Sequence, residues 1–156
     1  MESKLCALLD PKKDVDGMTP VSAAGVFTGS GQGFPPCTAQ ACMALLDYYH
    51  IDCAGKSAAV IGRSAVVGRP AAMLLLARNA TVTVCHTGTK DVAAVTREAD
   101  IIITAAGAAG SLTAAHVRPG QVVVDVSTNW NGVSLCGDAV FDDVSQIVEA
   151  ITPVPG

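Results

Sequence analysis

The sequence predicts an α/β protein of the Rossmann type, a three-layer domain in which helices cover both faces of a mainly parallel sheet. Residues 56–87 alternate strand, glycine-bearing turn, helix and strand over the length of one βαβ crossover. Short, wholly apolar runs recur along the chain, as expected of strands buried on both faces. Only 4% of the residues are aromatic against 50% hydrophobic, so the core is built mainly from Val, Ala, Leu and Ile.

Two helices are predicted before the first strand. Residues 2–9 show a short amphipathic helical pattern that stops at Asp10-Pro11. A longer helix is predicted over residues 39–50, because Thr38 can cap it. One stripe of that helix is apolar, which predicts a buried face made of Cys42, Leu45, Leu46 and Tyr49.

The segment between these helices is punctuated by Pro and Gly, and we predict little regular structure in it. It begins with a charged turn over residues 12–17 and lasts until Pro36. A loop of this length is unusual in a compact domain and is generally functional. Asp14 and Asp16 either share in that function or only cap turns, as Asp beside Gly often does.

The central unit begins with an apolar strand over residues 57–61 that ends at Gly62-Arg63-Ser64. Residues 67–77 follow as a helix packed on the sheet, with Pro70 in its first turn, where proline is tolerated. Residues 81–85 form a second, β-branched strand. The remaining predicted elements are a helix at 91–98, a buried strand at 100–107, a connector at 112–117, a strand at 121–126, a hairpin turn at Asn131-Gly132, a helix at 144–150 and an extended piece at 151–156.

The small residues at the end of the strand at 100–107 leave two interpretations open. They would let a flat ring or a ribose lie against the backbone, or they only allow close packing. The end of the strand at 121–126 faces the same carboxyl edge of the sheet, where ligands bind in this architecture.

The turn at Gly62-Arg63-Ser64 is a candidate anion site, because a helix that starts directly after a buried strand presents unpaired N–H groups to the crevice. Gly62 permits a close backbone approach, and Gly68 permits tight contact near the helix start. The spacing differs from the common dinucleotide pattern G-x-G-x-x-G, so the generic motif alone is weak evidence.

The end of the second strand indicates which nucleotide would bind. Most NAD sites place an Asp or Glu there, whereas this strand ends Cys85-His86-Thr87. Arg63, Thr87 and His86 would attract a ribose phosphate, which favours NADP over NAD. The alternative is that Arg63 is a solvated surface residue, Ser64 a helix cap and His86 an ordinary loop histidine.

The length and composition of the chain exclude several classes of protein. The chain has 156 residues, which predicts one domain, and a formal net charge of −4 without basic runs, which argues against nucleic-acid and membrane-surface binding. No apolar run is long enough to span a membrane and no signal-peptide pattern is present, so we expect a cytoplasmic protein. The 6 cysteines are scattered without C-x-x-C spacing, and the 3 histidines are dispersed, which predicts reduced thiols and no metal.

Taken together, these stretches resemble the methylenetetrahydrofolate dehydrogenase/methenyltetrahydrofolate cyclohydrolase family, specifically its C-terminal NAD(P)-binding domain. The resemblance covers nearly the whole chain and is specific as a set. It is carried by PKKDVDG at 11–17, FPPCT at 34–38, GKSAAVIGRSAVVGRP at 55–70, LLLARNATVTVCHT at 74–87, ADIIITAAG at 99–107, VVVDVS at 122–127, GD at 137–138 and TPVPG at 152–156.

The resemblance implies an enzyme that transfers hydride from methylene-tetrahydrofolate to NADP and then hydrolyses the methenyl product. It also implies a boundary: residues 1–17 as a remnant of the N-terminal catalytic domain and 18–156 as the NAD(P)-binding domain. The cofactor-binding residues that it implies are Gly62, Arg63, Ser64, Thr87 and Thr128. The folate-binding residues that it implies are Asp16, Pro153, Val154, Pro155 and Gly156.

The departures from the family pattern concern catalysis. In the family a separate N-terminal domain carries the catalytic Tyr and Lys, and no residue of this sequence matches them, so no catalytic residue is expected in the chain. Ser127 and Thr128 replace a Gly and an apolar residue. We therefore expect NADP binding without cyclohydrolase activity in isolation. The alternatives are a non-catalytic module that pairs with a separate catalytic half, a homodimer, or a Rossmann domain that binds no nucleotide.

Overall fold

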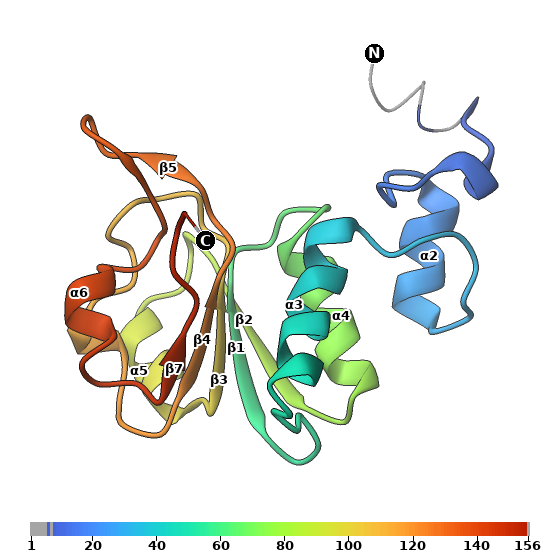
Figure 1. Ribbon diagram of the computed structural model, residues 1–156. Coiled ribbons are helices and arrows are strands. Elements are labelled where there is room, and N and C mark those ends of the chain that lie inside the picture. Colours follow the sequence, from blue (N-terminus) through green and yellow to red (C-terminus); the bar gives the residue numbers. More distant parts are fainter. Residues whose placement is uncertain (1–5, 7, 156) are drawn as a thin grey trace.

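A parallel sheet forms the centre of the computed structural model, which describes residue 6 and residues 8–155 (Figure 1). The strands stand in the order β2-β1-β3-β4-β7, and every neighbouring pair is parallel. The four predicted strands are confirmed, the third and fourth shorter than predicted: β1 Ser57–Ile61, β2 Thr81–Cys85, β3 Ile101–Thr104 and β4 Val122–Asp125. In β1, β3 and β4, which lie inside the sheet, most of the β-branched and small apolar residues are buried, whereas the edge strand β2 is only partly buried. The fifth strand of the sheet, β7 (Ala150–Ile151), was not predicted.

The alternation of side chains along each strand supplies two cores, one on each face of the sheet. Ala58 and Val60 face α3 (Cys37–Tyr48) and α4 (Gly68–Ala77), while Ala59 faces the opposite core. That second core is covered by α5 (Val92–Glu98), α6 (Phe141–Val144) and the short 3₁₀ helix η2 (Ala114–His116). Figure 1 shows the resulting three layers, so the predicted Rossmann-type architecture is confirmed.

Helix α3 departs in detail from the prediction. It begins at Cys37 after Pro36, without a side-chain cap, so the capping role predicted for Thr38 is wrong. Its buried stripe is Ala39, Cys42, Met43 and Leu46, whereas Leu45 is 37% and Tyr49 65% exposed. Tyr49 is the C-cap residue, beyond the last helical residue, and is not part of the buried face.

The segment predicted to be irregular contains a helix, α2 (Pro20–Thr28), which corrects that prediction. Pro20 occupies the first helical position, the Thr19 hydroxyl accepts a hydrogen bond from the Ser22 N–H at 3.1 Å, and Gly29 ends the helix in the left-handed conformation. The helix predicted over residues 2–9 lies largely outside the described residues, of which residues 6 and 8 are helical.

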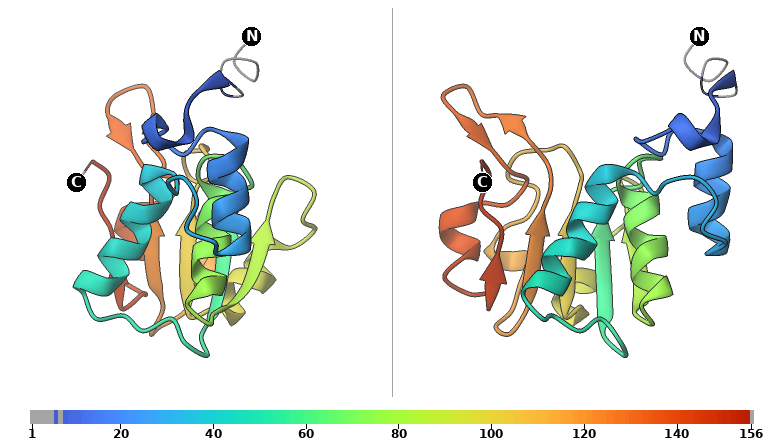
Figure 2. Two further views of the ribbon diagram at one scale, coloured as in Figure 1. Left: turned by 90° about the vertical axis from the view of Figure 1, so that its right-hand side faces the viewer. Right: turned by 45° about the vertical axis from the view of Figure 1, so that its right-hand side comes forward.

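Residues 8–36 form an arm beside the three-layer body. It carries α2 and a 3₁₀ helix, η1 (Pro11–Lys13), and it stands beyond α4, away from the sheet (Figures 1 and 2). The arm contacts the body where α2 packs against α4.

The last helix predicted, residues 144–150, is also wrong. Helix α6 ends at Val144, and the chain then turns so that Ala150 and Ile151 form the fifth strand, paired with β4. The Gln121 carbonyl accepts hydrogen bonds from the N–H groups of Glu149 and Ala150 and thereby holds this segment at the sheet edge.

The hairpin turn predicted at Asn131-Gly132 is confirmed by the antiparallel pair β5 (Asn129–Trp130) and β6 (Leu135–Cys136). Within the described part of the chain, no helix is both long and apolar enough to cross a membrane.

Candidate nucleotide-binding crevice

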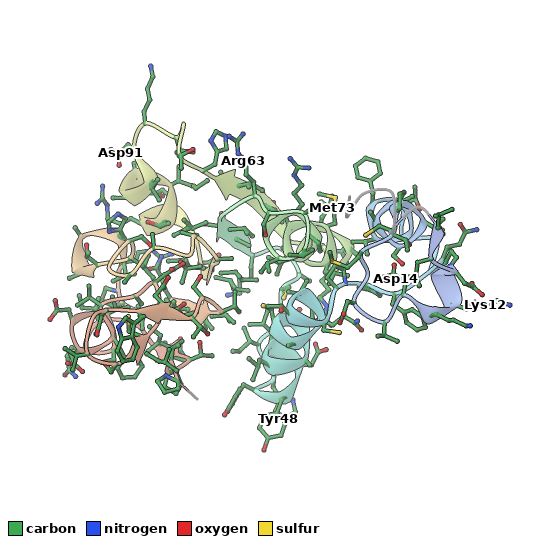
Figure 3. All side chains as sticks on the ribbon, turned by 90° about the horizontal axis from the view of Figure 1, so that it is seen from above. Lys12, Asp14, Tyr48, Arg63, Met73 and Asp91 are labelled. Carbon is green, nitrogen blue, oxygen red and sulfur yellow. The ribbon has the colours of Figure 1, made fainter. Side chains whose placement is uncertain are left out.

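The carboxyl ends of the strands meet at one edge of the sheet, which Figure 3 shows from above. The chain order of the strands reverses at β1, which has β2 on one side and β3 on the other, and such a reversal opens a crevice for ligands. Gly62, with φ +120°, follows β1, and a Cβ added there would collide with the carbonyl oxygen of Ala105, which follows β3. A Cβ on Gly68 would collide with the Gly62 carbonyl. Glycine at both positions thus lets the two loops and the start of α4 approach closely.

The loop between β1 and α4 presents a run of unpaired backbone donors. Among the described residues, no acceptor contacts the N–H groups from Arg63 to Val66. The Ser64 hydroxyl oxygen, which lies before α4, accepts hydrogen bonds from the N–H groups of the N-cap residue Val67 at 3.1 Å and of Gly68 at 3.3 Å. Its own proton stays available to a ligand. These donors, at the positive end of the α4 dipole, favour an anion.

Arg63 adds an uncommitted positive charge to this loop. Its side chain is exposed and makes no ion pair or hydrogen bond with a described residue. Figure 3 shows Arg63 between Asp91 and Met73, on the outer rim of the sheet edge. The carboxylate of Asp91 is already engaged, because it caps α5 by accepting from the Ala94 N–H at 2.8 Å.

The end of β2 carries hydroxyl and imidazole groups rather than a carboxylate. Thr87 is exposed. The Nδ1 atom of His86 accepts a hydrogen bond from the Gly88 N–H at 3.0 Å, so its proton lies on Nε2, where it can be donated. Together with Arg63, these groups suit a phosphate on the adenosine ribose better than a free ribose hydroxyl.

The loop after β3 is organised differently, around the buried carboxylate of Asp138. This carboxylate is 0% exposed and accepts hydrogen bonds from the hydroxyls of Thr104 and Ser127, both at 2.8 Å, and from the Asn129 amide at 3.0 Å. It also accepts from backbone N–H groups of the loop. Burial raises the pKa of Asp138, but the hydrogen bonds outweigh burial and the pKa lies below its ordinary value.

A second buried carboxylate, Asp125, lies at the end of β4. It accepts hydrogen bonds from the N–H groups of Ala139 at 2.8 Å and Ser127 at 3.2 Å. Burial is the main reason that its pKa is raised, and the charge of Asp138 raises it further. Asp125, Thr152 and Val154 help line a cavity of about 420 Å³ beside the β5–β6 hairpin.

The residues predicted for the cofactor come from neighbouring loops. Gly62, Arg63 and Ser64 lie between β1 and α4, Thr87 follows β2, and Thr128, which is exposed, stands between β4 and β5. All five thus lie on segments that follow strands at the carboxyl edge of the sheet.

The residues predicted for folate come from opposite ends of the chain. Asp16 is exposed on the arm, with its Oδ1 3.8 Å from the Cys37 Sγ. Residues 153–155 follow β7 at the far edge of the sheet, and Gly156 lies outside the described residues. An open hollow of about 460 Å³ on the arm is lined by Lys13, Asp14 and Asp16 together with apolar side chains.

The sequence did not single out Asp138, Ser127 and Thr104 as a group, although it contains Gly-Asp at 137–138. All three are buried polar residues at strand ends, and only the fold brings them together. All 6 cysteines are free thiols. Across residue 6 and residues 8–155, no group of three or more His, Cys, Asp or Glu side chains is arranged to hold a metal ion.

Comparisons with known proteins show which family has this architecture. Residues 36–156 match the model of a family described as "Tetrahydrofolate dehydrogenase/cyclohydrolase, NAD(P)-binding domain". The bifunctional protein FolD of Carboxydothermus hydrogenoformans is 51% identical over 99% of this chain and 55% of its own length. FolD of Methanospirillum hungatei is likewise 51% identical, over 99% of this chain and 55% of its length. The chain therefore spans about half the length of the curated relatives that it matches.

Solved structures agree with this. The crystal structure of the bifunctional FolD enzyme of Campylobacter jejuni superposes with a TM-score of 0.97 at 43% identity, over 100% of this chain and 56% of that one. The Trypanosoma brucei methylenetetrahydrofolate dehydrogenase-cyclohydrolase, solved with NADP cofactor and inhibitor, gives a TM-score of 0.92 at 34% identity, over 99% of this chain and 56% of that one. The chain thus belongs to the tetrahydrofolate dehydrogenase/cyclohydrolase family and corresponds to its NAD(P)-binding domain.

Proposed function

We propose that the chain binds NADP at the carboxyl edge of its sheet and serves as the coenzyme-binding half of a methylenetetrahydrofolate dehydrogenase/cyclohydrolase of one-carbon metabolism. The observation that carries this proposal is the run of N–H groups from Arg63 to Val66 beside the Arg63 guanidinium, none of which has a partner in the part of the chain that the structure describes. The Trypanosoma brucei relative, solved with NADP, supports the choice of ligand.

Each predicted cofactor residue has a role that its position supports. Gly62 lets the nucleotide approach the backbone, and Ser64 donates its free hydroxyl proton to a phosphate. Arg63 and Thr87 hold the phosphate on the adenosine ribose. Thr128, exposed after β4, borders the nicotinamide side. NADP supplies the hydride acceptor when it is bound, and the contribution of these residues is to hold and orient it.

The folate derivative is proposed to lie against Asp16 and residues 153–156. The family's catalytic Tyr and Lys have no counterpart in this sequence, so we propose that the chain holds no catalytic residue. For the polypeptide tested alone, hydrolysis of methenyl-tetrahydrofolate is expected at the spontaneous rate, because no lysine stands in the matching context. Turnover above that rate would refute this expectation. The cytoplasmic location expected from the sequence stays a prediction.

Titration calorimetry with NADP and NAD tests the proposal. The purified chain is expected to bind NADP more tightly than NAD. The Arg63→Ala variant is expected to lose about 10- to 100-fold in NADP affinity, the usual value of a hydrogen bond to a charged group, and to change little toward NAD. Arg69→Ala, which removes another exposed arginine from the same helix start, is the matched control. Equal affinity for both nucleotides in the wild type would reject the NADP assignment.

A second candidate function, a module that pairs with another polypeptide or with its own copy, is favoured by exposed apolar side chains. Leu8 and Phe27 on the arm are 83% and 75% exposed, and Val133 on the hairpin is 84% exposed. Light scattering after gel filtration separates the cases. A mass of 15.8 kDa means a monomer, and twice that mass means a homodimer. Copurification with a catalytic chain would identify a complementing partner.

A further inference from the structure

The loop after β3 is oriented by one carboxylate. Asp138 accepts hydrogen bonds from the N–H groups of Ala106 at 2.7 Å and Ala108 at 2.8 Å. The amide between them, that of Gly107, donates to the Ser127 hydroxyl oxygen at 3.2 Å, and this hydroxyl donates its own proton to Asp138 at 2.8 Å. Three successive amides of the loop are therefore held by Asp138, two directly and one through Ser127.

This arrangement makes the two loops of the crevice chemically different. In the loop after β1, the N–H groups of residues 63–66 have no acceptor among the described residues and can receive a phosphate. In the loop after β3, the N–H of Ala105 donates to the Ile61 carbonyl at 2.7 Å, and the next three amides are held as described. Residues 105–108 therefore offer no free donor to an anion.

The loop after β3 presents a smooth, accessible surface. Residues 106–108 are exposed and carry only methyl groups or no side chain. At Gly107, where φ is +66°, a Cβ would project into open space. Such a surface suits a flat ring and its sugar rather than a phosphate group.

We propose that Asp138 and Ser127 are positioning residues for the coenzyme: they fix residues 106–108 in the shape on which the nicotinamide ribose half rests. The phosphorylated adenosine half is held independently, at the loop after β1. This inference rests on the proposed function and deepens it, because it assigns the two halves of the ligand to two separately organised loops.

Removing the Ser127 hydroxyl tests whether the two halves of NADP are held by two separately organised loops. In Ser127→Ala, the Gly107 amide loses its acceptor while Asp138 still holds the amides of Ala106 and Ala108, so the ligand must order the backbone at Gly107. Binding of NADP is then expected to weaken about 5- to 10-fold, the effect of one hydrogen bond. Binding of adenosine 2′,5′-bisphosphate, which lacks the nicotinamide half, is expected to stay unchanged. Ser145→Ala, which removes an exposed hydroxyl that bonds only the Asp142 carbonyl, is the control and should change neither affinity.

The measurement is titration calorimetry of both ligands on the full chain, with the amide resonance of Gly107 followed by NMR. Faster exchange of that amide in Ser127→Ala, together with selective loss of NADP affinity, supports the inference. Unchanged NADP affinity, or an equal loss for both ligands as a general structural defect would cause, overturns it. A wild-type chain that binds neither ligand removes the proposed function as well, so the two failures can be told apart.

Discussion

Gly62 and Gly68 are required for different physical reasons at the same turn. Gly62 needs both a positive φ and the space next to the Ala105 carbonyl, whereas Gly68 has ordinary helical geometry and lacks only room, because a Cβ there would collide with the Gly62 carbonyl. Helix propensity alone favours Ala over Gly by about 1 kcal/mol. Steric overlap with backbone cannot be relieved by a side-chain rotation, so overlap decides the outcome at Gly68.

We predict that Gly68→Ala lowers the free energy of unfolding by about 3 kcal/mol, as overpacking against backbone does. Gly55→Ala is the control, because Gly55 has φ +72° but no atom within 4 Å of an added Cβ. It should cost only the left-handed strain of about 1 kcal/mol. Urea denaturation followed by circular dichroism measures both. A Gly68→Ala chain as stable as the wild type would show that the turn can open without cost.

Thr87 offers a test of nucleotide choice at the level of one side chain. A carboxylate at the end of β2 attracts free ribose hydroxyls and repels a ribose phosphate. We predict that Thr87→Glu reverses the preference, with weaker NADP binding and tighter NAD binding by calorimetry. Thr83→Glu, on an exposed position of the same strand, is the matched control. Equal losses toward NADP in both variants would mean that only net charge matters.

At the scale of elements, α2 is stabilised by a carboxylate that precedes it. Asp14 accepts hydrogen bonds from the N–H groups of Met18 and Thr19, both at 2.8 Å, and from the Ser22 hydroxyl at 2.6 Å. Burial raises the pKa of Asp14, but these hydrogen bonds outweigh it and lower the pKa from 3.8 to about 2. The aspartate therefore acts as a structural cap of the arm, which was one of the two roles left open by the sequence.

The lowered pKa gives a pH dependence with a definite sign. Because the folded-state pKa lies below the unfolded value, the unfolded arm binds more protons, and the stabilisation is present above pH 3.8 and lost as the pH falls toward about 2. We predict that the amide resonances of Met18 and Thr19 lose their hydrogen-bonded shifts over this interval. Asp14→Asn should abolish the dependence, and Asp16→Asn should leave it intact. A transition that survives in Asp14→Asn would assign it to another group.

Local patterns predicted β1 to β4 well, because each of these strands is a short run of apolar or β-branched residues in the sequence. β1 and β2 have the predicted bounds, since apolar runs there end at Gly62 and follow Asn79-Ala80. Helix α2 was missed because its proline and glycines resemble loop punctuation. Pro20 in fact starts the helix, and Gly25 lies within it because a Cβ there would collide with the Gln32 carbonyl. A tertiary contact of this kind leaves no local signal.

One part of the candidate site could also be predicted from local sequence and another part could not. The turn from Gly62 to Ser64 could be predicted, because strand, turn and helix are contiguous. The Asp138 network could not, because Thr104 and Asp138 are 34 residues apart and meet only through the order of the strands. The start of the terminal strand β7 was mistaken for helix: Ala150 was assigned to the helix over residues 144–150, whereas Ile151 was assigned to an extended piece, because the apolar pattern there fits both periods.

At the scale of the whole molecule, the strand order brings the loops at residues 63–66 and 105–108 to the same edge of the sheet, with the arm and the β7 edge on either side (Figures 1 and 3). The crevice is formed by loops whose residues are exposed at 63–66 and 106–108. A ligand bridging these loops would connect elements from both layers of helices. Binding should therefore stabilise the whole fold, and not only the loops.

We predict that NADP raises the melting temperature of the chain. At a free concentration 100 times its dissociation constant, a ligand that binds only the folded state adds about 2.7 kcal/mol. In a chain of 156 residues this corresponds to a shift of about 5 to 10 °C. Arg63→Ala at the same NADP concentration should shift markedly less, because its dissociation constant is higher, while its melting temperature without ligand should match the wild type. Scanning calorimetry measures all four values. Equal shifts in the two proteins would place the nucleotide away from the loop after β1, and no shift in either would mean that the folded chain does not bind it.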